Sequence, residues 1–367
     1  IFMMFLLFLA FSCSLNQALN IKMSQQASKS VLIIGGTRFS GLYLWKELDE
    51  RGHKVTLLNR GKTAPQKLPS ENEEQFENRM KRASFLTGDR TNTNDLEQLR
   101  SQTFDVIYDL NGREVGDTAP VVDMFKGRLE HYVYMSSAGV YKKSAIMPHH
   151  EDDAEDPSSR HKGKLETETY LRDSGIPFTS IRPTYIYGPL NYNPLEEYFF
   201  SRLSEKRRIC IPGHGQHVTG LGHVADLAVA MAQVMGREHT KGQIYNIQDI
   251  RSVTFQSLVE LCAKAMGKDA PEVDIKFYDQ SMFDFGGKKA FPMREQHFFC
   301  SVDKAVRDLD WTPKFSILDG LKDSYLHDFK LKKASGSLKN DFSCDDMILN
   351  DDRVAVLTYD GMAADDL

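Results

Sequence analysis

The stretch "SVLIIGGTRFSGLYLWKELDERGHKVTLLNRG" at residues 30–61 decides the fold of this chain. Its apolar run at 31–34 predicts a strand that is buried on both faces of a parallel sheet. A glycine-rich turn follows, then an amphipathic helix and a second strand. This order, within about thirty residues, predicts a dinucleotide site with the pyrophosphate on the helix N-terminus.

The turn supplies the first candidate contacts to such a cofactor. Its glycines give the tight bend and the close helix–strand contact that a bound pyrophosphate requires. Arg38 stands where the middle glycine of the usual spacing would be, and we expect it either to lie over a phosphate or to obstruct it. The predicted contacts from this turn are Gly35, Gly36, Thr37, Arg38, Phe39 and Gly41.

The residues after the second strand favour NADP over NAD. An NAD site usually has an acid here that binds the ribose hydroxyls, whereas arginine suits a 2′-phosphate. This chain has Asn59, Arg60, Gly61 and Lys62 at that point. If a dinucleotide binds, we expect NADP in contact with Arg60. The alternative is a solvated loop in which Arg60 and Lys62 face water.

Three further predicted strands end in polar residues. "ASFLTGD" ends at Asp89, "FDVIYDLNG" contains Asp109, and "HYVYMSSAGVY" runs through Ser136 and Ser137. The carboxyl ends of parallel strands face the ligand crevice. Asp89 and Asp109 are therefore predicted to contact the adenine and ribose of a cofactor, or alternatively to cap the helices that follow them.

Composition indicates an ordinary soluble globular protein with an acidic end. The chain has 367 residues and a formal net charge of −5, which by itself does not indicate nucleic-acid binding. Residues 340–367 contain eight aspartates and one base, Arg353, a charge of −7, so the remainder carries +2. Five scattered cysteines, none in a CxxC pair, argue against a disulfide framework and a zinc site.

The first residues predict targeting. "IFMMFLLFLAFSCS" has the length of a signal-peptide apolar segment, and the residues up to Ser30 include lysines and serines but no acid. We predict that residues 1–29 direct the protein to a plastid, with no stable membrane association once they are removed. The alternative is that translation starts at Met23 and that the protein is cytoplasmic.

Five motifs in this order resemble the extended short-chain dehydrogenase/reductases of the sugar-nucleotide epimerase type. They are "GGTRFSG" (35–41), "SSAGVY" (136–141), "KLETE" (164–168), "IRPTYIYGP" (181–189) and "GHVADLAVA" (222–230). The resemblance implies a catalytic serine, tyrosine and lysine, of which Ser137 and Lys164 match. Arg160 stands where the tyrosine would be, and a guanidinium cannot act as a general acid or base near neutral pH.

The resemblance implies an α/β fold, with a Rossmann-type doubly wound parallel sheet and a small C-terminal subdomain of the substrate-binding type. We expect the dinucleotide-binding core at 30–189, with 221–250 returning to it. The small subdomain is expected at 190–220 and 251–335, and an acidic tail at 336–367. The first half of that tail retains apolar residues, so it is expected either to dock on the body or to remain a solubilising end.

Four more specific motifs resemble the chloroplast stem-loop RNA-binding proteins, which are relatives of those enzymes. They are "SSRHKGKLETE" (158–168), "GPLNYNPLEE" (188–197), "FDFGGKKAFPMREQHFF" (283–299) and "DDMIL" (345–349). This resemblance implies a chloroplast stromal protein that binds stem-loop RNA and acts in transcript processing and stability. It also implies a divalent-metal-dependent endonuclease activity, with an ion such as Mg²⁺, and oligomers with itself or a paralogue.

Basic residues permit RNA binding, because cations on phosphates supply most of the affinity. The segment 283–299 interleaves bases with phenylalanines, which is the composition of a stacking platform but equally of a subdomain core with a solvated turn. No recognised RNA-binding module is present, so the RNA prediction depends on the resemblance. The predicted RNA contacts are Arg160, His161, Lys162, Arg207, Arg208, Lys288, Lys289 and Arg294.

The sequence predicts no metal site. Asp109, Glu151, Asp152 and Asp153 are available carboxylates, but their spacing does not mark metal ligands, and "HHEDDAED" (149–156) is more typical of a charged surface loop. Whether the chain is an enzyme stays open. Beside RNA binding, the sequence allows an NADP-dependent nucleotide-sugar epimerase, dehydratase or reductase. A non-catalytic NADP-binding assembly or sensor protein is the third alternative.

Overall fold

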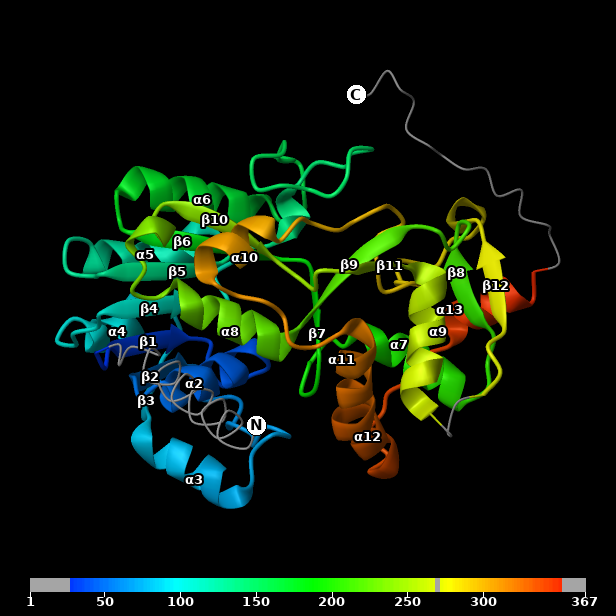
Figure 1. Cartoon of the computed structure of the whole chain (residues 1–367), viewed down its shortest axis with the longest axis horizontal. Coiled ribbons are helices and arrows are strands. Elements are labelled where there is room, and N and C mark those ends of the chain that lie inside the picture. Colours follow the sequence, from blue (N-terminus) through cyan, green and yellow to red (C-terminus); the bar gives the residue numbers. More distant parts are fainter. Residues whose placement is uncertain (1–26, 268–270, 352–367) are drawn as a thin grey trace, which may run out of the picture.

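The computed structural model describes residues 27–267 and 271–351 (Figure 1). The predicted targeting segment therefore lies outside the described residues up to 26, and so does the acidic tail after 351. Among the described residues, none of the helices has the length and apolar character needed to cross a membrane.

A parallel sheet forms the centre of the molecule. Its order is β10-β6-β5-β4-β1-β2-β3, and every neighbouring pair is parallel. From β1 the strands are added first toward β3 and then, from β4 on, toward the opposite edge, and this reversal of strand order between β1 and β4 is the switch point at which such sheets bind ligands. The strands of this sheet are β1 (Ser30–Ile34), β2 (Lys54–Asn59), β3 (Ser84–Thr87), β4 (Val106–Asp109), β5 (His131–Met135), β6 (Phe178–Pro183) and β10 (Gln243–Ile247).

Helices cover both faces of this sheet (Figure 1). Alternate residues of β1 enter two different cores, Val31 and Ile33 on one face and Leu32 and Ile34 on the other. This explains why the strand reads as a continuous apolar run. The helices of the two faces are α2 (Ser40–Glu50), α3 (Glu73–Arg82), α4 (Thr93–Leu96), α5 (Val115–Phe125), α6 (Lys162–Ser174), α8 (Val224–Val234) and α10 (Asp303–Leu309). The predicted doubly wound α/β class is confirmed.

The C-terminal part builds a second core on two small sheets, whose orders are β11-β9-β7 and β12-β8. The strands are β7 (Tyr185–Tyr187), β8 (Ile209–Pro212), β9 (Val218–His223), β11 (Ser252–Thr254) and β12 (Ile275–Tyr278). The helices are α7 (Leu195–Ser204), α9 (Phe255–Met266), α11 (Ile317–Ser324), a π-helical turn (Tyr325–Phe329), α12 (Lys330–Ala334) and α13 (Ser343–Leu349).

Candidate functional site

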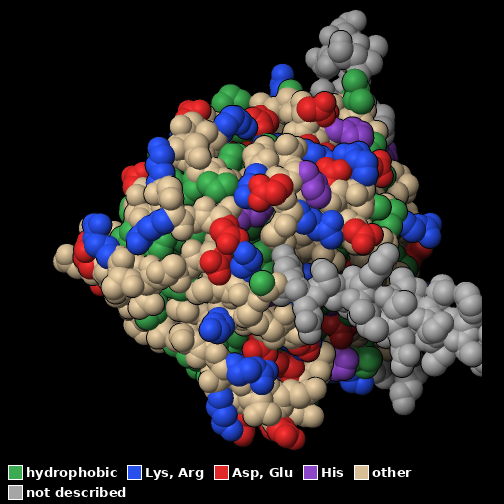
Figure 2. Space-filling model, turned by 60° about the vertical axis from the view of Figure 1, so that its left-hand side comes forward, with side chains coloured by type: hydrophobic (Ala, Val, Ile, Leu, Met, Phe, Trp, Pro, Cys, Tyr) green, Lys and Arg blue, Asp and Glu red, His purple; other side chains and the backbone are tan. Residues whose placement is uncertain are grey.

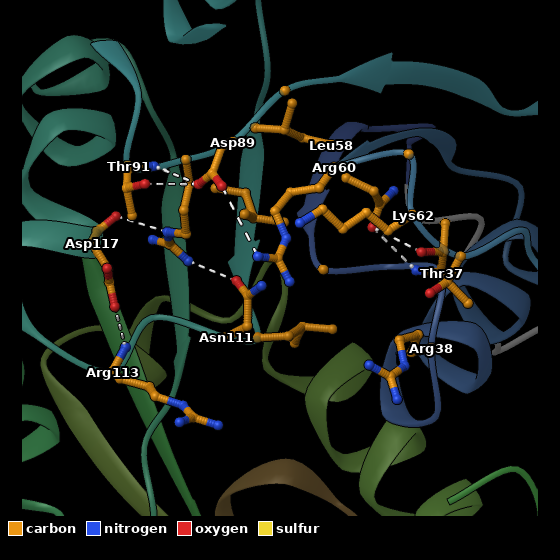
Figure 3. A pocket seen from close by; sticks show the side chains of 18 of the residues that line it. Thr37, Arg38, Leu58, Arg60, Lys62, Asp89, Thr91, Asn111, Arg113 and Asp117 are labelled. Atoms are coloured by element: carbon orange, nitrogen blue, oxygen red, sulfur yellow. Dashed lines mark hydrogen bonds and ion pairs between the residues drawn. The ribbon is translucent and has the colours of Figure 1, made fainter. Parts of the chain in front are cut away.

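A cavity of about 600 Å³ opens at the carboxyl ends of β1, β2 and β4, where the glycine-rich turn meets the loops after β2 and β4. Ile34, Leu58 and Leu110 supply its apolar wall, and most of the other lining side chains are polar or charged. Figure 3 shows Arg113 and Arg38 on opposite sides of the cavity, with Arg60 and Lys62 between them. This is the position at which the sequence predicts a dinucleotide.

The turn before α2 has the close packing that a pyrophosphate site needs. Gly35 has a φ of +95°, and a Cβ at Gly41 would lie 2.5 Å from the carbonyl oxygen of Gly35. Phe39 precedes α2 without a side-chain cap, and the first turn of α2 contains no acid. The positive end of the helix dipole is therefore not neutralised by an acid, although the N–H groups of Gly41 and Leu42 already donate to the carbonyl oxygens of Arg38 and Phe39, both at 2.9 Å.

The turn's other side chains are held by their neighbours. Thr37 donates from its backbone N and its Oγ1 to Oδ1 of Asn59, at 3.3 and 3.2 Å. The Arg38 guanidinium lies 4.2 Å from the ring centre of Tyr192, and Phe39 packs edge-on against the same ring. Arg38 therefore flanks the cavity without filling it, so the residues present fit a dinucleotide.

Opposite charges lie at the far wall of the cavity. Arg60 and Asp89 are partly exposed, and Nη1 of Arg60 is 4.0 Å from Oδ2 of Asp89. Hydrogen bonds from Thr91 hold the pKa of Asp89 below its usual value, with smaller effects from Arg60 and Lys62. Asp89 therefore remains an acceptor facing the cavity, and Arg60 and Lys62 remain donors for a phosphate.

Asp109 occupies a different place from the one the sequence predicts. Its side chain is completely buried below the cavity, where it pairs with Arg90 and accepts hydrogen bonds from Thr118 and Tyr132 at 2.8 Å. Burial tends to raise the pKa of Asp109, but the charge and hydrogen bonds of Arg90 bring it to about 2. Its carboxylate links β4, β5 and α5, and its oxygens are saturated by protein donors, so no contact to a cofactor is assigned to it.

The three residues that the sequence predicts at the positions of the dehydrogenase catalytic set are Ser137, Arg160 and Lys164, and none of them is a tyrosine. Ser137 uses its Oγ to accept the N–H of Gly139 at 3.0 Å. Lys164 donates to the carbonyl oxygens of Met135 and Gly112, at 2.6 and 3.1 Å, and burial lowers its pKa to about 8. Arg160 is exposed, and its Nε donates to Nε2 of His161 at 3.1 Å.

Neither of two other tyrosines can readily take the missing role. Tyr141 is 3% exposed and donates to Oδ1 of Asn246 at 2.7 Å. Tyr187 is 1% exposed and donates to the carbonyl oxygen of Ile317. Burial raises the pKa of both phenols well above the usual value, so their hydroxyls stay protonated and donate hydrogen bonds within the core.

A group of basic side chains instead surrounds the start of α6. Among the described residues, none of the lysines and arginines in this group has a carboxylate oxygen within 4.0 Å. Arg294 reaches across from the C-terminal part and donates to the carbonyl oxygen of Gly139 at 3.3 Å. We call this group the mouth cluster, and its members are Arg113, Arg160, His161, Lys162, Lys164, Lys289 and Arg294.

Like charge and burial perturb the mouth cluster. Burial, then the charges of Arg160 and Arg294, lowers the pKa of His161 to about 4. The pKa values of Lys289 and Arg294 are also lowered, first by burial and then by neighbouring cations that include Arg160. A bound anion would supply the missing ion-pair partner and relieve this repulsion.

The other predicted RNA contacts are paired with acids. Arg207 binds Asp346, Arg208 lies 2.9 Å from Asp274, and Lys288 lies 3.0 Å from Asp341. The first half of the acidic tail therefore docks through α13, onto the C-terminal part that Figure 1 places away from α6. Figure 2 shows another face, on which Lys and Arg are interspersed with Asp and Glu as on an ordinary surface.

The carboxylates considered for a metal point to different partners. Asp109 binds Arg90, Glu151 accepts the N–H of Asn246 at 2.9 Å, and Asp153 lies 3.1 Å from His149. Within 27–267 and 271–351, histidine, cysteine, aspartate and glutamate form no group arranged to hold a metal ion.

Comparison with known proteins assigns the chain to a family. The NAD dependent epimerase/dehydratase family matches residues 31–247, more than half of the chain. The chain belongs to the NAD-dependent epimerase/dehydratase family. This confirms the resemblance inferred from the five ordered motifs. Members of this family typically bind NAD or NADP.

A more specific relative is the "Chloroplast stem-loop binding protein of 41 kDa b, chloroplastic" of Arabidopsis thaliana. It is 49% identical over 329 residues, which are 89% of this chain and 86% of the relative. This epimerase/dehydratase family member is therefore a homologue of a stem-loop binding protein, and the second resemblance is confirmed as well.

Solved structures support the fold alone. This family member matches a dTDP-glucose 4,6-dehydratase from Bacillus anthracis, in complex with NAD, at a TM-score of 0.67 and 19% identity. The match covers 84% of this chain and 99% of the other. A UDP-glucose 4-epimerase from Thermotoga maritima matches at a TM-score of 0.64 and 21% identity, covering 83% and 99%.

Sequence reasoning missed Arg113 and Tyr192, which both line the cavity. Arg113 follows the strand end at Asp109, so its position after a sheet strand could have singled it out. Tyr192 comes from the loop before α7, and only the folded chain brings it to Arg38.

Proposed function

We propose that this chain binds stem-loop RNA in a plastid and acts in RNA processing or stability. The RNA phosphates contact the mouth cluster, and the adjoining cavity takes NADP. The observation that carries this proposal is the group of unpaired cations at the mouth, with Arg160 where a dehydrogenase has its acid. The Arabidopsis thaliana relative that is 49% identical is named a chloroplast stem-loop binding protein, which supports the same proposal.

The mouth cluster suits phosphate for a physical reason. Cations that already pair with protein carboxylates must lose those partners before they bind RNA, whereas cations without a carboxylate partner give up only water or a hydrogen bond to a neutral acceptor. Arg160 and Lys162 are exposed at the start of α6, and Arg294 faces the same turn from the C-terminal part. Phosphate binding at these groups releases counterions from the RNA, which makes affinity fall with salt.

The test is hairpin binding, measured by fluorescence anisotropy between about 50 and 200 mM salt. We expect the double variant Arg160→Gln/Lys162→Gln to lose about tenfold or more in affinity, with a salt slope reduced by about two contacts. Arg207→Gln/Arg208→Gln is the matched control, because it removes the same charge from residues that pair with Asp346 and Asp274. Equal losses in the two variants, or no binding at low salt, would contradict the proposal.

The preference for NADP over NAD depends on Arg60 and Lys62, which line the cavity, and of which Arg60 has Asp89 at 4.0 Å. A dinucleotide supplies a nicotinamide ring that can exchange hydride when it is bound. This chain lacks a proton donor at the Arg160 position, so the residues present bind and orient the cofactor without completing proton transfer. Comparing NADP and NAD affinities by calorimetry tests the preference.

Cleavage of RNA and assembly with another copy or a paralogue stay predictions from the resemblance. Incubating a labelled hairpin with Mg²⁺ and with EDTA tests the first. Light scattering of the purified chain tests the second. Metal-dependent cleavage that survives in a binding-deficient Arg160→Gln/Lys162→Gln variant would show that cleavage uses another surface.

Two other functions are less well supported. An NADP-dependent nucleotide-sugar reaction needs an acid near Lys164, but the candidate phenols of Tyr141 and Tyr187 are buried and bonded elsewhere. A non-catalytic NADP-binding sensor explains the cavity but leaves the mouth cluster without a ligand. Turnover of a UDP- or GDP-sugar would establish the first, and an NADP-bound oligomer that ignores RNA would establish the second.

A further inference from the structure

Arg113 belongs both to the mouth cluster and to the wall of the cavity. This residue lines the cavity, and its charge also acts on His161 and Lys164. A Cβ placed at Gly163 in the first turn of α6 would lie 2.5 Å from the carbonyl oxygen of Arg113. The loop that carries Arg113 therefore packs directly on the helix turn that carries the cluster.

Lys164 holds the two parts in register. Its Nζ donates to the carbonyl oxygen of Gly112, next to Arg113, and to that of Met135 at the end of β5. A phosphate bound at the start of α6 therefore lies beside the cavity entrance. An RNA strand that leaves this phosphate can pass Arg113 and enter the cavity.

The cavity has the size and chemistry for a nucleotide. Its volume of about 600 Å³ lies within the range of small-molecule sites. Ile34, Leu58 and Leu110 provide an apolar wall for a base, while Arg60 and Lys62 provide donors for a phosphate. These groups recognise a nucleotide whether it belongs to a free dinucleotide or to a polynucleotide.

An exposed aromatic stands at the edge of the same cavity. Tyr192 is 65% exposed although it lines the cavity, and Arg38 lies over its ring at 4.2 Å. Stacking of unpaired bases on aromatic rings and guanidinium planes is the usual way in which proteins recognise single-stranded RNA. A paired base in a stem is already stacked and cannot enter such a cavity.

We propose that the cavity takes an unpaired nucleotide next to the stem of the bound RNA, so that RNA and a dinucleotide exclude each other. This inference rests on the proposed function, because the mouth cluster must first hold the stem phosphates. The shared cavity makes the exclusion reciprocal, so bound RNA blocks the dinucleotide as bound dinucleotide blocks the RNA nucleotide.

The experiment compares two hairpins with the full chain. One has about five unpaired nucleotides on its 3′ side, a length within the site sizes of single-strand binding folds, and the other is blunt. We expect the flanked hairpin to bind about tenfold more tightly, equivalent to 1.4 kcal/mol. Added NADP⁺ should raise the apparent Kd of the flanked hairpin in proportion to its concentration and leave the blunt hairpin unchanged.

Tyr192→Ala is the matching variant, and Leu331→Ala, which truncates an equally exposed side chain on α12, is its control. Tyr192→Ala should bring the flanked hairpin close to the affinity of the blunt one and leave the affinity of the blunt hairpin unchanged. The inference is overturned if both hairpins bind equally, or if NADP⁺ that calorimetry shows to be bound leaves the flanked hairpin's Kd unchanged. Absence of binding by either hairpin refutes the proposed function itself.

Discussion

Arg160 donates its Nε–H to Nε2 of His161 at 3.1 Å, which places the proton of the neutral imidazole on Nδ1. A protonated ring would have no acceptor for this bond and would add a charge beside Arg160 and Arg294. The pKa of His161 is accordingly lowered to about 4, first by burial and then by these cations. Arg160 therefore helps to keep His161 uncharged at neutral pH.

This relationship predicts a pH dependence of stability. The pKa of His161 is lower in the folded chain than its ordinary value of 6.5, so the unfolded chain binds the proton more readily. The free energy of unfolding should fall as pH drops from about 6.5 to about 4, with a contribution from His161 on the order of 1 kcal/mol after allowance for partial exposure. Urea unfolding of wild type and His161→Gln at pH 7 and about pH 4.5 measures the difference. Identical losses in the two proteins would contradict it.

The mouth cluster should show opposite effects on binding and on stability. Arg160→Gln removes a cation from a group of like charges that has no carboxylate partner. We expect hairpin affinity to fall severalfold while the free energy of unfolding stays the same or rises by about 0.5 kcal/mol, because a surface charge is lost without leaving a buried partner. Anisotropy and urea unfolding check the two parts. A loss of more than about 1 kcal/mol in stability would show that Arg160 is structural.

The docking of α13 should depend on one buried ion pair. Nε of Arg202 lies 2.9 Å from Oδ2 of Asp345, whose side chain is fully buried. Arg202→Met leaves that carboxylate without a cation and should cost about 3–5 kcal/mol. Arg207 faces the more exposed Asp346, so Arg207→Met should lower the free energy of unfolding by about 1 kcal/mol or less. Thermal unfolding ranks the two, and equal costs would refute the distinction.

The glycine-rich turn should tolerate no side chain at its last glycine. A Cβ at Gly41 would lie 2.5 Å from Gly35 O and 2.7 Å from Gly36 Cα, both backbone atoms that cannot rotate away. Gly41→Ala should cost about 1–3 kcal/mol and abolish dinucleotide binding. Gly116→Ala in α5 is the control, because a Cβ there meets nothing within 4 Å, and it should be neutral or stabilising by up to about 1 kcal/mol. Urea unfolding compares both variants with wild type, and a Gly41→Ala protein as stable as wild type would show that the turn can relax.

Cofactor preference should depend on Arg60. Its guanidinium lines the cavity, with Asp89 only at 4.0 Å. Arg60→Ala should weaken NADP binding about tenfold and NAD binding much less, because only NADP carries the 2′-phosphate. Calorimetric titration with both dinucleotides measures the ratio. A similar loss of affinity for NADP and for NAD would show that Arg60 contacts a part of the cofactor that both dinucleotides share.

Local sequence determined the fold and the geometry of the glycine-rich turn. The apolar run of β1 alternates between two buried faces, and Gly35 and Gly41 occupy positions that a larger residue cannot share. Burial pattern and glycine geometry are set by a few neighbouring residues, so they can be read from the chain. The motif at 158–168 likewise predicted, through the resemblance, that an arginine stands at the position of the catalytic tyrosine.

Only the tertiary structure decided which charges are available. Sequence reasoning treated Asp109, Arg207 and Lys288 like Asp89, Arg160 and Lys289, because the residue type is all that a strand end or a basic run shows. The fold buries Asp109 against Arg90 and brings Asp346 and Asp341 to Arg207 and Lys288 from more than fifty residues away. An ion pair depends on distance in space, and partners so far apart in the chain cannot be identified by spacing. For the same reason Arg294 and Arg113 join the start of α6 only in the folded protein, where they leave one group of cations unpaired.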